Sequence, residues 1–216
     1  MLTLALRDRA APLTLLALGA HCDDIEIGCA GTLRTLADRY PQLTQHWVTF
    51  TSEPTREPES RAAAERLFAG EQRPRLHFEA FRASYFPDQW GRIKDSFEAL
   101  RERVKPDLVL THHLADRHQD HRIIAELTWN TFRDHLILEY EIPKYEGDRG
   151  QPNCYVPLSR DTVALKVTTL LECFPTQRAR SWFTEDTFRA HLRLRGIECN
   201  APDGFAEAFH ARKLVI

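Results

Sequence analysis

Apolar runs and helical stripes alternate along the first two thirds of the chain. Apolar or alternating segments typical of β-strands cover 13–19, 45–50, 75–81 and 107–111. After each comes a segment with apolar residues every three or four positions, and these segments predict helices over 32–40, 59–69, 93–104 and 123–132. The alternation predicts the α/β class, with a mainly parallel sheet and helices on both of its faces.

The last third of the chain follows a less regular pattern. We expect a strand over 136–142, a loop over 143–157, and helices over 161–173 and 185–194 that pack on the sheet edge. No internal repeat, low-complexity tract or linker interrupts the sequence, and its 216 residues suit one domain. The sequence therefore predicts a single domain over 1–216.

The amino-acid composition argues against some classes of binding partner and some locations. The 29 Lys and Arg against 31 Asp and Glu give a net charge of −2, which offers no electrostatic reason to expect nucleic acid. No stretch reaches the roughly 18–20 apolar residues of a membrane span. Residues 1–8 lack the basic start and long apolar stretch of a signal peptide. Five scattered cysteines without a CxxC pair fit free thiols, so we expect a cytoplasmic protein, with a homo-oligomer left open.

Two clusters of histidine and aspartate carry the candidate chemistry. His21-Cys22-Asp23-Asp24 follows the first predicted strand, and Arg117-His118-Gln119-Asp120-His121 follows the fourth. Since ligands bind at the carboxyl ends of strands in open α/β sheets, both clusters are expected at one site. Either cluster alone would also fit a helix N-cap or a structural His–Asp hydrogen bond. Together they favour a single metal site with nitrogen and oxygen ligands.

The side chains of the two clusters suit different tasks in the hydrolysis of an amide. Zinc in hydrolytic sites is commonly held by three protein ligands, here expected to be His21, Asp24 and His121. Asp23 then remains as the general base toward water. His118 is the candidate acid or oxyanion partner, and Asp120 is placed to fix the tautomer of a histidine.

The same residues resemble the signatures of a known family. The segment from His21 to Leu33 is similar to the His-x-Asp-Asp-x-x-x-Gly-x-x-Gly-Thr signature of PIG-L/LmbE-like de-N-acetylases. His118 to His121 resembles the second signature of that family, His-x-Asp-His. The resemblance implies a Rossmann-like fold, a zinc ion or another divalent metal such as Fe²⁺, and removal of acetyl from an N-acetylglucosamine-type sugar. It implies the same roles for the residues above, and candidate substrate contacts at Arg56, Asp88 and Arg117.

Some residues near the clusters need a separate interpretation. Cys22 stands where the family most often has proline; we expect a small filler, although a thiol beside zinc could be oxidised or capture a second metal. His112 and His113 are interpreted first as loop residues. Gly28 and Gly31 have Gly-x-x-Gly spacing, which favours a tight turn and close helix-to-strand packing over a dinucleotide-binding loop.

The substrate itself stays open at the level of sequence. The loops over 51–58, 84–91 and 143–157 are expected to shape the pocket, but they do not identify a sugar. An amidase that cleaves another small-molecule amide, such as a thiol conjugate, uses the same residues. A non-catalytic sugar-binding protein on the same fold would need no base. A metal phosphohydrolase would be expected to carry more carboxylates, for two metals.

Overall fold

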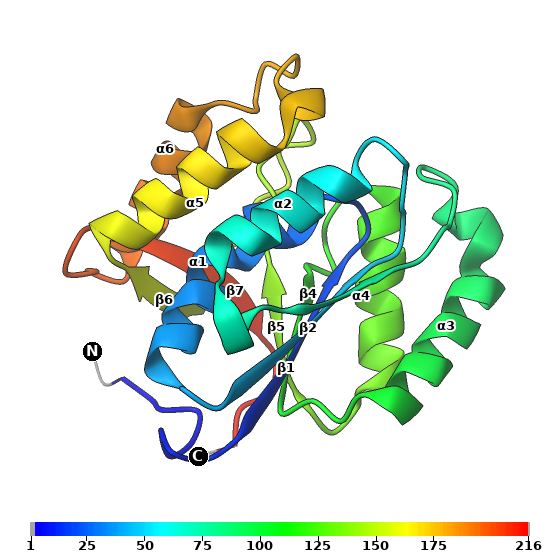
Figure 1. Ribbon diagram of the computed structural model, residues 1–216, viewed down its shortest axis with the longest axis horizontal. Coiled ribbons are helices and arrows are strands. Elements are labelled where there is room, and N and C mark those ends of the chain that lie inside the picture. Colours follow the sequence, from blue (N-terminus) through cyan, green and yellow to red (C-terminus); the bar gives the residue numbers. More distant parts are fainter. Residues whose placement is uncertain (1–2, 216) are drawn as a thin grey trace.

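The computed structural model describes residues 3–215. The prediction that residues 1–8 are not a signal peptide falls partly on Met1 and Leu2, which lie outside the described residues. The described residues form a seven-stranded sheet of order β3-β2-β1-β4-β5-β7-β6 (Figure 1). The strands are β1 Leu13–Gly19, β2 Leu43–Thr49, β3 Arg75–Phe78, β4 Leu108–His112, β5 Leu136–Tyr140, β6 Cys154–Leu158 and β7 Phe205–Ala211. Every neighbouring pair is parallel except those of β7, which runs against both β5 and β6. The predicted α/β class with a mainly parallel sheet is confirmed.

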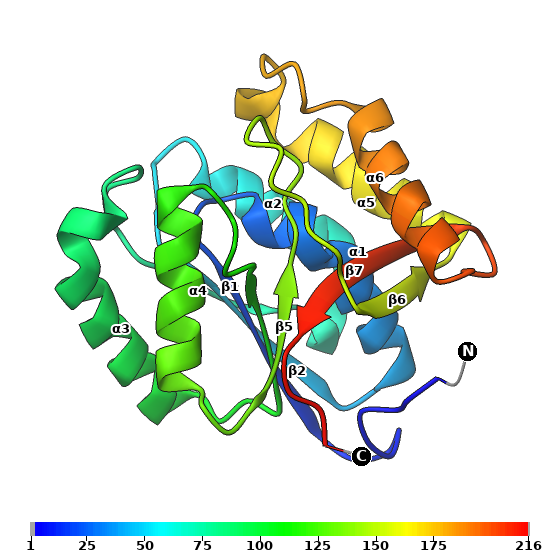
Figure 2. The same ribbon diagram turned by 180° about the vertical axis from the view of Figure 1, so that it is seen from behind.

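Helices cover both faces of the sheet (Figures 1 and 2). They are α1 Asp24–Arg39, α2 Glu57–Leu67, α3 Trp90–Arg103, α4 Gln119–Thr131, α5 Arg160–Cys173 and α6 Glu185–Glu198. Leu15 and Ala17 of β1 share one core cluster with α1, α2, α5 and α6, whereas Leu16 and Leu18 share the other with α3 and α4. Because β1 is buried on both faces, it appears in the sequence as a continuous apolar run.

Three parts of the predicted element pattern differ from the structure. Helix α1 begins at Asp24 rather than at Thr32, because residues 24–33 are buried on all sides and so show no apolar stripe. The predicted loop over 143–157 contains most of β6, and β7 was not predicted. Strand β7 was missed because it carries a buried Glu207, whose charge is paired with Lys166 across the fold.

The carboxyl-terminal helices do more than line the sheet edge. Helix α5 packs on α1 and α2, and α6 packs on β7. From α5, the buried Lys166 ammonium contacts the Glu207 carboxylate and the carbonyl of Ile27. Glu207 accepts hydrogen bonds from the backbone N–H groups of Gly31, at 2.9 Å, and Thr32, at 2.6 Å. This ion pair therefore ties α5 and β7 to the middle of α1. Within residues 3–215, none of the helices has the length and apolarity needed to traverse a lipid bilayer.

The two glycines of the first signature allow α1 to lie close to the sheet. A Cβ atom on Gly28 would lie 2.2 Å from the ring of Tyr140, and one on Gly31 would lie 2.6 Å from Leu158. A Cβ at Gly28 would overlap the Tyr140 ring, and one at Gly31 would force Leu158 to shift, so the predicted close packing of helix and strand is confirmed. The predicted tight turn is wrong, because both glycines lie inside α1. This packing fixes the start of α1, which carries the first cluster.

Candidate metal centre and active site

The two clusters lie side by side at the carboxyl ends of neighbouring strands. The chain runs from β1 to β2 on one side and later returns to β4 on the other side of β1. Such a reversal of strand order opens a crevice where α/β proteins bind ligands. The first cluster occupies the turn from β1 into α1. The second occupies the end of the loop from β4 and the first turn of α4.

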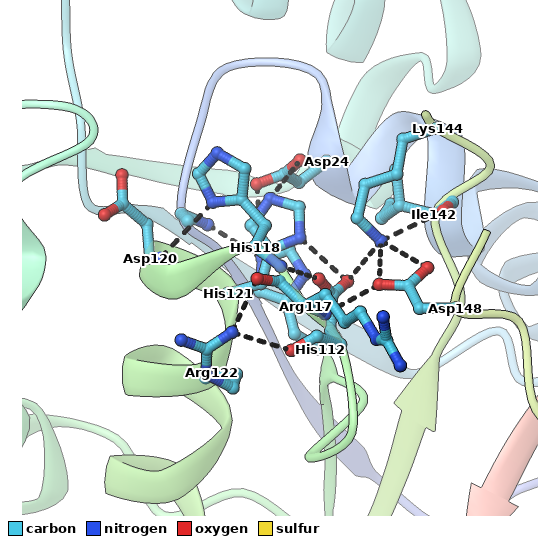
Figure 3. A network of polar contacts seen from close by, with 12 residues as sticks. Asp24, His112, Arg117, His118, Asp120, His121, Arg122, Ile142, Lys144 and Asp148 are labelled. Atoms are coloured by element: carbon cyan, nitrogen blue, oxygen red, sulfur yellow. Dashed lines mark hydrogen bonds and ion pairs between the residues drawn. The ribbon is translucent and has the colours of Figure 1, made fainter. Parts of the chain in front are cut away.

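Donor atoms of three side chains from the two clusters converge. One atom each of His21, Asp24 and His121 lies within 4.8 Å of the other two. Nε2 of His121 is 3.5 Å from Oδ1 of Asp24 (Figure 3). Nδ1 of His21 is 3.3 Å from Oδ2 of Asp24 and 3.3 Å from Nε2 of His121. Two imidazole nitrogens and one carboxylate oxygen at this spacing fit a zinc-type ion with an open position for water or substrate.

The electrostatics of this cluster also suit a cation. Burial opposes ionisation of Asp24, but His121, His112 and His21 hold the pKa of its carboxyl well below the usual range. Burial, together with His112, lowers the pKa of His121 to about 3, so its imidazole stays neutral. Burial would also lower the pKa of His21, but Asp24 and Asp120 outweigh it and raise that pKa to about 10. A carboxylate and a neutral imidazole are the forms that bind metal, and the raised pKa of His21 shows that positive charge is favoured here.

Asp23 is at the N-cap of α1 but does not cap it. Its side chain makes no capping hydrogen bond, and its backbone adopts φ 156° and ψ −19°, a combination that few non-glycine residues adopt. Instead, Oδ1 lies 2.8 Å from Nη2 of Arg56. Burial raises the pKa of Asp23 to about 6; Arg56 works against this rise and Asp24 adds to it. The simple N-cap alternative therefore does not describe this aspartate.

His118 and Asp120 hold the start of α4 against the first cluster. The His118 side chain caps α4 by accepting from the N–H of Asp120, and its ring lies edge-on to His21 at 5.0 Å between centroids. Burial lowers the pKa of His118, and His21 adds to this effect. Asp120 lies 3.1 Å from Nε2 of His21 and accepts the backbone N–H groups of Ser84 and Phe86. Asp120 therefore orients His21, and it fastens the loop before α3.

A cavity of about 490 Å³ opens over these side chains, within the usual range for small-molecule sites. His21, Asp23, Asp24, His118 and His121 all line it. Each of the three loops predicted to shape the pocket contributes lining residues. The segment from Thr176 to Trp182 was not predicted, and it supplies a further wall.

The three predicted substrate contacts have different positions. Arg56 lines the cavity, where its Nη2 also donates to the carbonyl of Cys22 at 2.8 Å. Asp88 is exposed in the 3₁₀ turn Phe86–Gln89 and does not line the cavity. Arg117 is also exposed and outside the cavity wall, and its backbone N–H donates to Asp148. Among these three, only Arg56 is placed to meet a ligand in the cavity.

Cys22 is buried behind the cluster rather than directed into the cavity. Its Sγ donates to the carbonyl of Thr51 at 3.3 Å. Burial, with Glu26 nearby, raises the pKa of this thiol to about 12, so it stays protonated and is a poor metal ligand. All five cysteines are free. The interpretation of Cys22 as a small filler agrees with this placement.

His112 corrects the loop interpretation, because it is the last residue of β4 and fully buried. Its Nε2 lies 3.2 Å from Oδ2 of Asp24 and accepts the N–H of Ala20 at 3.0 Å. Its ring stacks on that of His121, with centroids 3.9 Å apart. His112 thus packs against Asp24 and His121 from behind. The predicted strand ended at Thr111, and extending it by one residue would have placed His112 in β4.

Asp116 and Lys144 complete the surroundings of His121 and were also missed. Oδ2 of Asp116 lies 2.9 Å from Nδ1 of His121 and 3.0 Å from Nζ of Lys144. Burial would raise the pKa of Asp116, but His121, His112 and Lys144 hold it below the usual range. No local pattern identifies these residues, because Lys144 reaches Asp116 from the loop after β5.

Comparison with known proteins matches both clusters to one family. A family model described as PIG-L, GlcNAc-PI de-N-acetylase, matches residues 16–132. The chain is similar to the uncharacterized deacetylase YaiS of Escherichia coli (strain K12), with 32% identity over 143 residues that cover 60% of this chain and 74% of that protein.

Solved structures share the fold at lower sequence identity. The N,N'-diacetylchitobiose deacetylase of Pyrococcus horikoshii matches with a TM-score of 0.70 and 20% identity, over 92% of this chain and 83% of that chain. GalB of Pseudomonas putida KT2440, a 4-carboxy-2-hydroxymuconate hydratase, matches with a TM-score of 0.72 and 16% identity, over 94% and 98%. Because a deacetylase and a hydratase both have this fold, the fold by itself does not determine the reaction.

Proposed function

Since the chain belongs to the PIG-L family of GlcNAc-PI de-N-acetylases, we propose that it hydrolyses the acetamide of an N-acetylglucosamine-type sugar or glycoconjugate, with a divalent metal ion. One observation carries the proposal: the ligand set His21, Asp24 and His121 shares a cavity wall with Asp23 and His118. A binding protein would need no carboxylate with a pKa near 6 beside a metal centre.

His21, Asp24 and His121 would hold the metal ion. When bound, such an ion polarises a carbonyl oxygen and makes nearby water more acidic. Zinc suits two imidazoles and one carboxylate, and Fe²⁺ also accepts this donor set. The free thiols of the chain fit a reducing compartment such as the cytoplasm.

The side chains around the ligands supply the proton transfers. Asp23 takes a proton from water while the water oxygen attacks the acetamide carbonyl carbon. Arg56 holds the Asp23 carboxylate in place at 2.8 Å. His118 lines the same cavity wall and would stabilise the developing oxyanion. The carbon–nitrogen bond then breaks, and a proton from Asp23 or His118 goes to the departing nitrogen, which leaves acetate and a free amine.

Acetate release after metal removal and reconstitution tests this function. The purified chain is treated with a chelator, dialysed, and reloaded with Zn²⁺ or Fe²⁺ before incubation with N-acetyl sugars, nucleotide sugars and sugar–thiol precursors. We expect turnover to disappear with the metal and to return on reloading, with acetate and amine formed in equal amounts.

Other outcomes would point to the alternatives. Cleavage of an amide with release of a different acid would identify an amidase for another substrate. Saturable binding of the sugar without turnover of the reloaded chain would indicate a sugar-binding protein. Acetate release that is unaffected by complete metal removal would contradict the metal-dependent reaction.

A further inference from the structure

Behind His121 lies a buried cluster of three charged side chains that the proposed reaction does not use. Nζ of Lys144 is 3.0 Å from Oδ2 of Asp116. It is also 2.8 and 2.7 Å from the two carboxylate oxygens of Asp148 (Figure 3). The side chains of Asp116, Lys144 and Asp148 are only 3%, 7% and 6% exposed. Buried charges at this density are costly unless each has a partner. The burial of these three charged side chains therefore needs an explanation.

Asp116 connects these charged side chains to His118 and His121 through both of its carboxylate oxygens. Oδ2 lies 2.9 Å from Nδ1 of His121, and Oδ1 accepts the backbone N–H of His118 at 2.8 Å. An ionised carboxylate only accepts hydrogen bonds, so Nδ1 of His121 carries the proton. Nε2 then presents its lone pair toward Asp24 and His21. A carboxylate in this position orients a metal-ligating histidine and increases its basicity.

Lys144 balances the negative charge that Asp116 needs in order to orient His121. Asp116 and Asp148 are two carboxylates that share one ammonium group, and Asp148 also accepts the backbone N–H of Arg117 at 2.6 Å. Without the ammonium, Asp116 would face a second buried carboxylate with no cation between them. The carboxylate of Asp116 would then turn away from Asp148, and the hydrogen bond that fixes His121 would change.

We propose that Lys144 and Asp148 are positioning residues for the metal centre, which act through Asp116 to hold His121 in its ligating tautomer and orientation. This inference rests on the proposed metal site. It assigns to the loop after β5, which carries Lys144 and Asp148, a part in metal affinity in addition to shaping the cavity. A purely structural role would anchor this loop without affecting the ion.

Measurements of zinc affinity distinguish a positioning role of Lys144 and Asp148 from a purely structural one. The variants are Lys144→Met, Lys144→Arg and Asp148→Asn, with Lys94→Met as the matched control. Lys94 also forms an ion pair, with Glu98, but lies on α3 away from the site. Zinc dissociation constants are measured by competition with a chromophoric chelator, and unfolding of each metal-free variant is followed by circular dichroism. The d–d absorption spectrum of Co²⁺-loaded protein reports the geometry around the ion.

We expect Lys144→Met to weaken zinc binding by about 10–100-fold and to alter the Co²⁺ spectrum. Lys144→Arg should restore most of the affinity, because the guanidinium keeps the charge. Asp148→Asn should have a smaller effect, and it remains informative if Lys144→Met folds poorly. Lys94→Met should bind zinc like the wild type.

Two results would count against the inference in different ways. Wild-type zinc affinity and Co²⁺ spectra in folded Lys144→Met and Asp148→Asn, even with lowered unfolding midpoints, would leave a structural role only and overturn it. A wild-type chain that binds no divalent ion would overturn the proposed function, and this inference with it.

Discussion

Two adjacent aspartates with the same side chain have opposite environments at the centre of the site. Asp24 lies among His21, His112 and His121, and these partners keep its pKa well below the usual range. Asp23 has Arg56 as its partner, and burial raises its pKa to about 6. One carboxylate is therefore a permanent anion suited to a metal, and the other can exchange a proton near neutral pH. Adjacent positions acquire different chemistry from what surrounds them.

Replacement of the proposed base tests this division of roles. Asp23→Asn should keep the bound metal, because the expected ligands are untouched, but should lower kcat/KM by about 10²–10⁴-fold. Acetate release measures turnover, and elemental analysis measures the metal content. Asp88→Asn is the control, since Asp88 is an exposed carboxylate outside the cavity. Turnover near the wild-type level in Asp23→Asn would rule out Asp23 as the base.

At the scale of the element, helix α1 determines where the first cluster lies. Its glycines allow contact with Tyr140 and Leu158, and the Lys166–Glu207 ion pair also contacts its backbone. Tyr140 in turn donates its hydroxyl hydrogen to the carbonyl of Leu18 at 2.6 Å, just before the turn from β1 into α1. The start of α1 is thus held by contacts from β5, β6, α5 and β7.

A methyl group added to Gly28 should disturb this packing. Gly28→Ala would place a Cβ atom 2.2 Å from the Tyr140 ring, and we expect a loss of about 1–3 kcal/mol of unfolding free energy. Gly91→Ala is the matched control, because Gly91 is also helical, in α3, and a Cβ there meets no atom within 4 Å. It should be neutral or stabilise by up to about 1 kcal/mol. Urea unfolding of the two variants measures the difference, and equal stabilities would contradict the close-packing argument.

At the scale of the whole molecule, a buried group of charges joins the carboxyl-terminal elements to the sheet. Glu141, just after β5, forms an ion pair with Arg195 of α6 at 2.8 Å and lies 3.9 Å from His191 of the same helix. Burial lowers the pKa of His191 to about 4, although Glu141 works in the opposite direction. The folded chain therefore keeps this histidine neutral.

This histidine should make stability depend on pH. In the unfolded chain the pKa of His191 returns to about 6.5, so below that pH the unfolded state binds a proton that the folded state does not. The contribution to stability is complete above pH 6.5 and is lost as the pH falls toward 4, by roughly 3 kcal/mol in total. His121, with its pKa of about 3, contributes in the same direction, and His21, with its pKa of about 10, contributes in the opposite direction, so the test is the difference between variants.

His191→Gln should reduce the loss of unfolding free energy between pH 7.5 and about 4.5. Urea unfolding is measured with a chelator present, so that release of metal does not add to the pH dependence. Leu194→Gln, at an exposed position of the same helix, serves as the control; it removes no titratable group and should leave the slope as in the wild type. If His191→Gln and the wild type lose stability in parallel, another group is responsible.

How much the sequence could predict depends on the distance between the residues concerned. The strands β1 and β4 and helix α3 are set by local apolar patterns, and were predicted to within a few residues. The start of α1 was not, because burial on all sides removes the stripe that marks a helix. Strand β7 was missed because its buried Glu207 is compensated by Lys166, 41 residues away in the chain.

The sequence by itself determined the alternation of strands and helices, the two clusters at the ends of strands, and the family. These depend on periodicity and on neighbouring residues, which a linear chain displays directly. Only the tertiary structure decided that His112 and Asp116 contact the proposed metal ligands, that Lys144 and Asp148 lie behind Asp116, and that Asp88 and Arg117 lie outside the cavity. Burial and the charges around a group set its pKa and its partners, and both arise only when distant segments pack together.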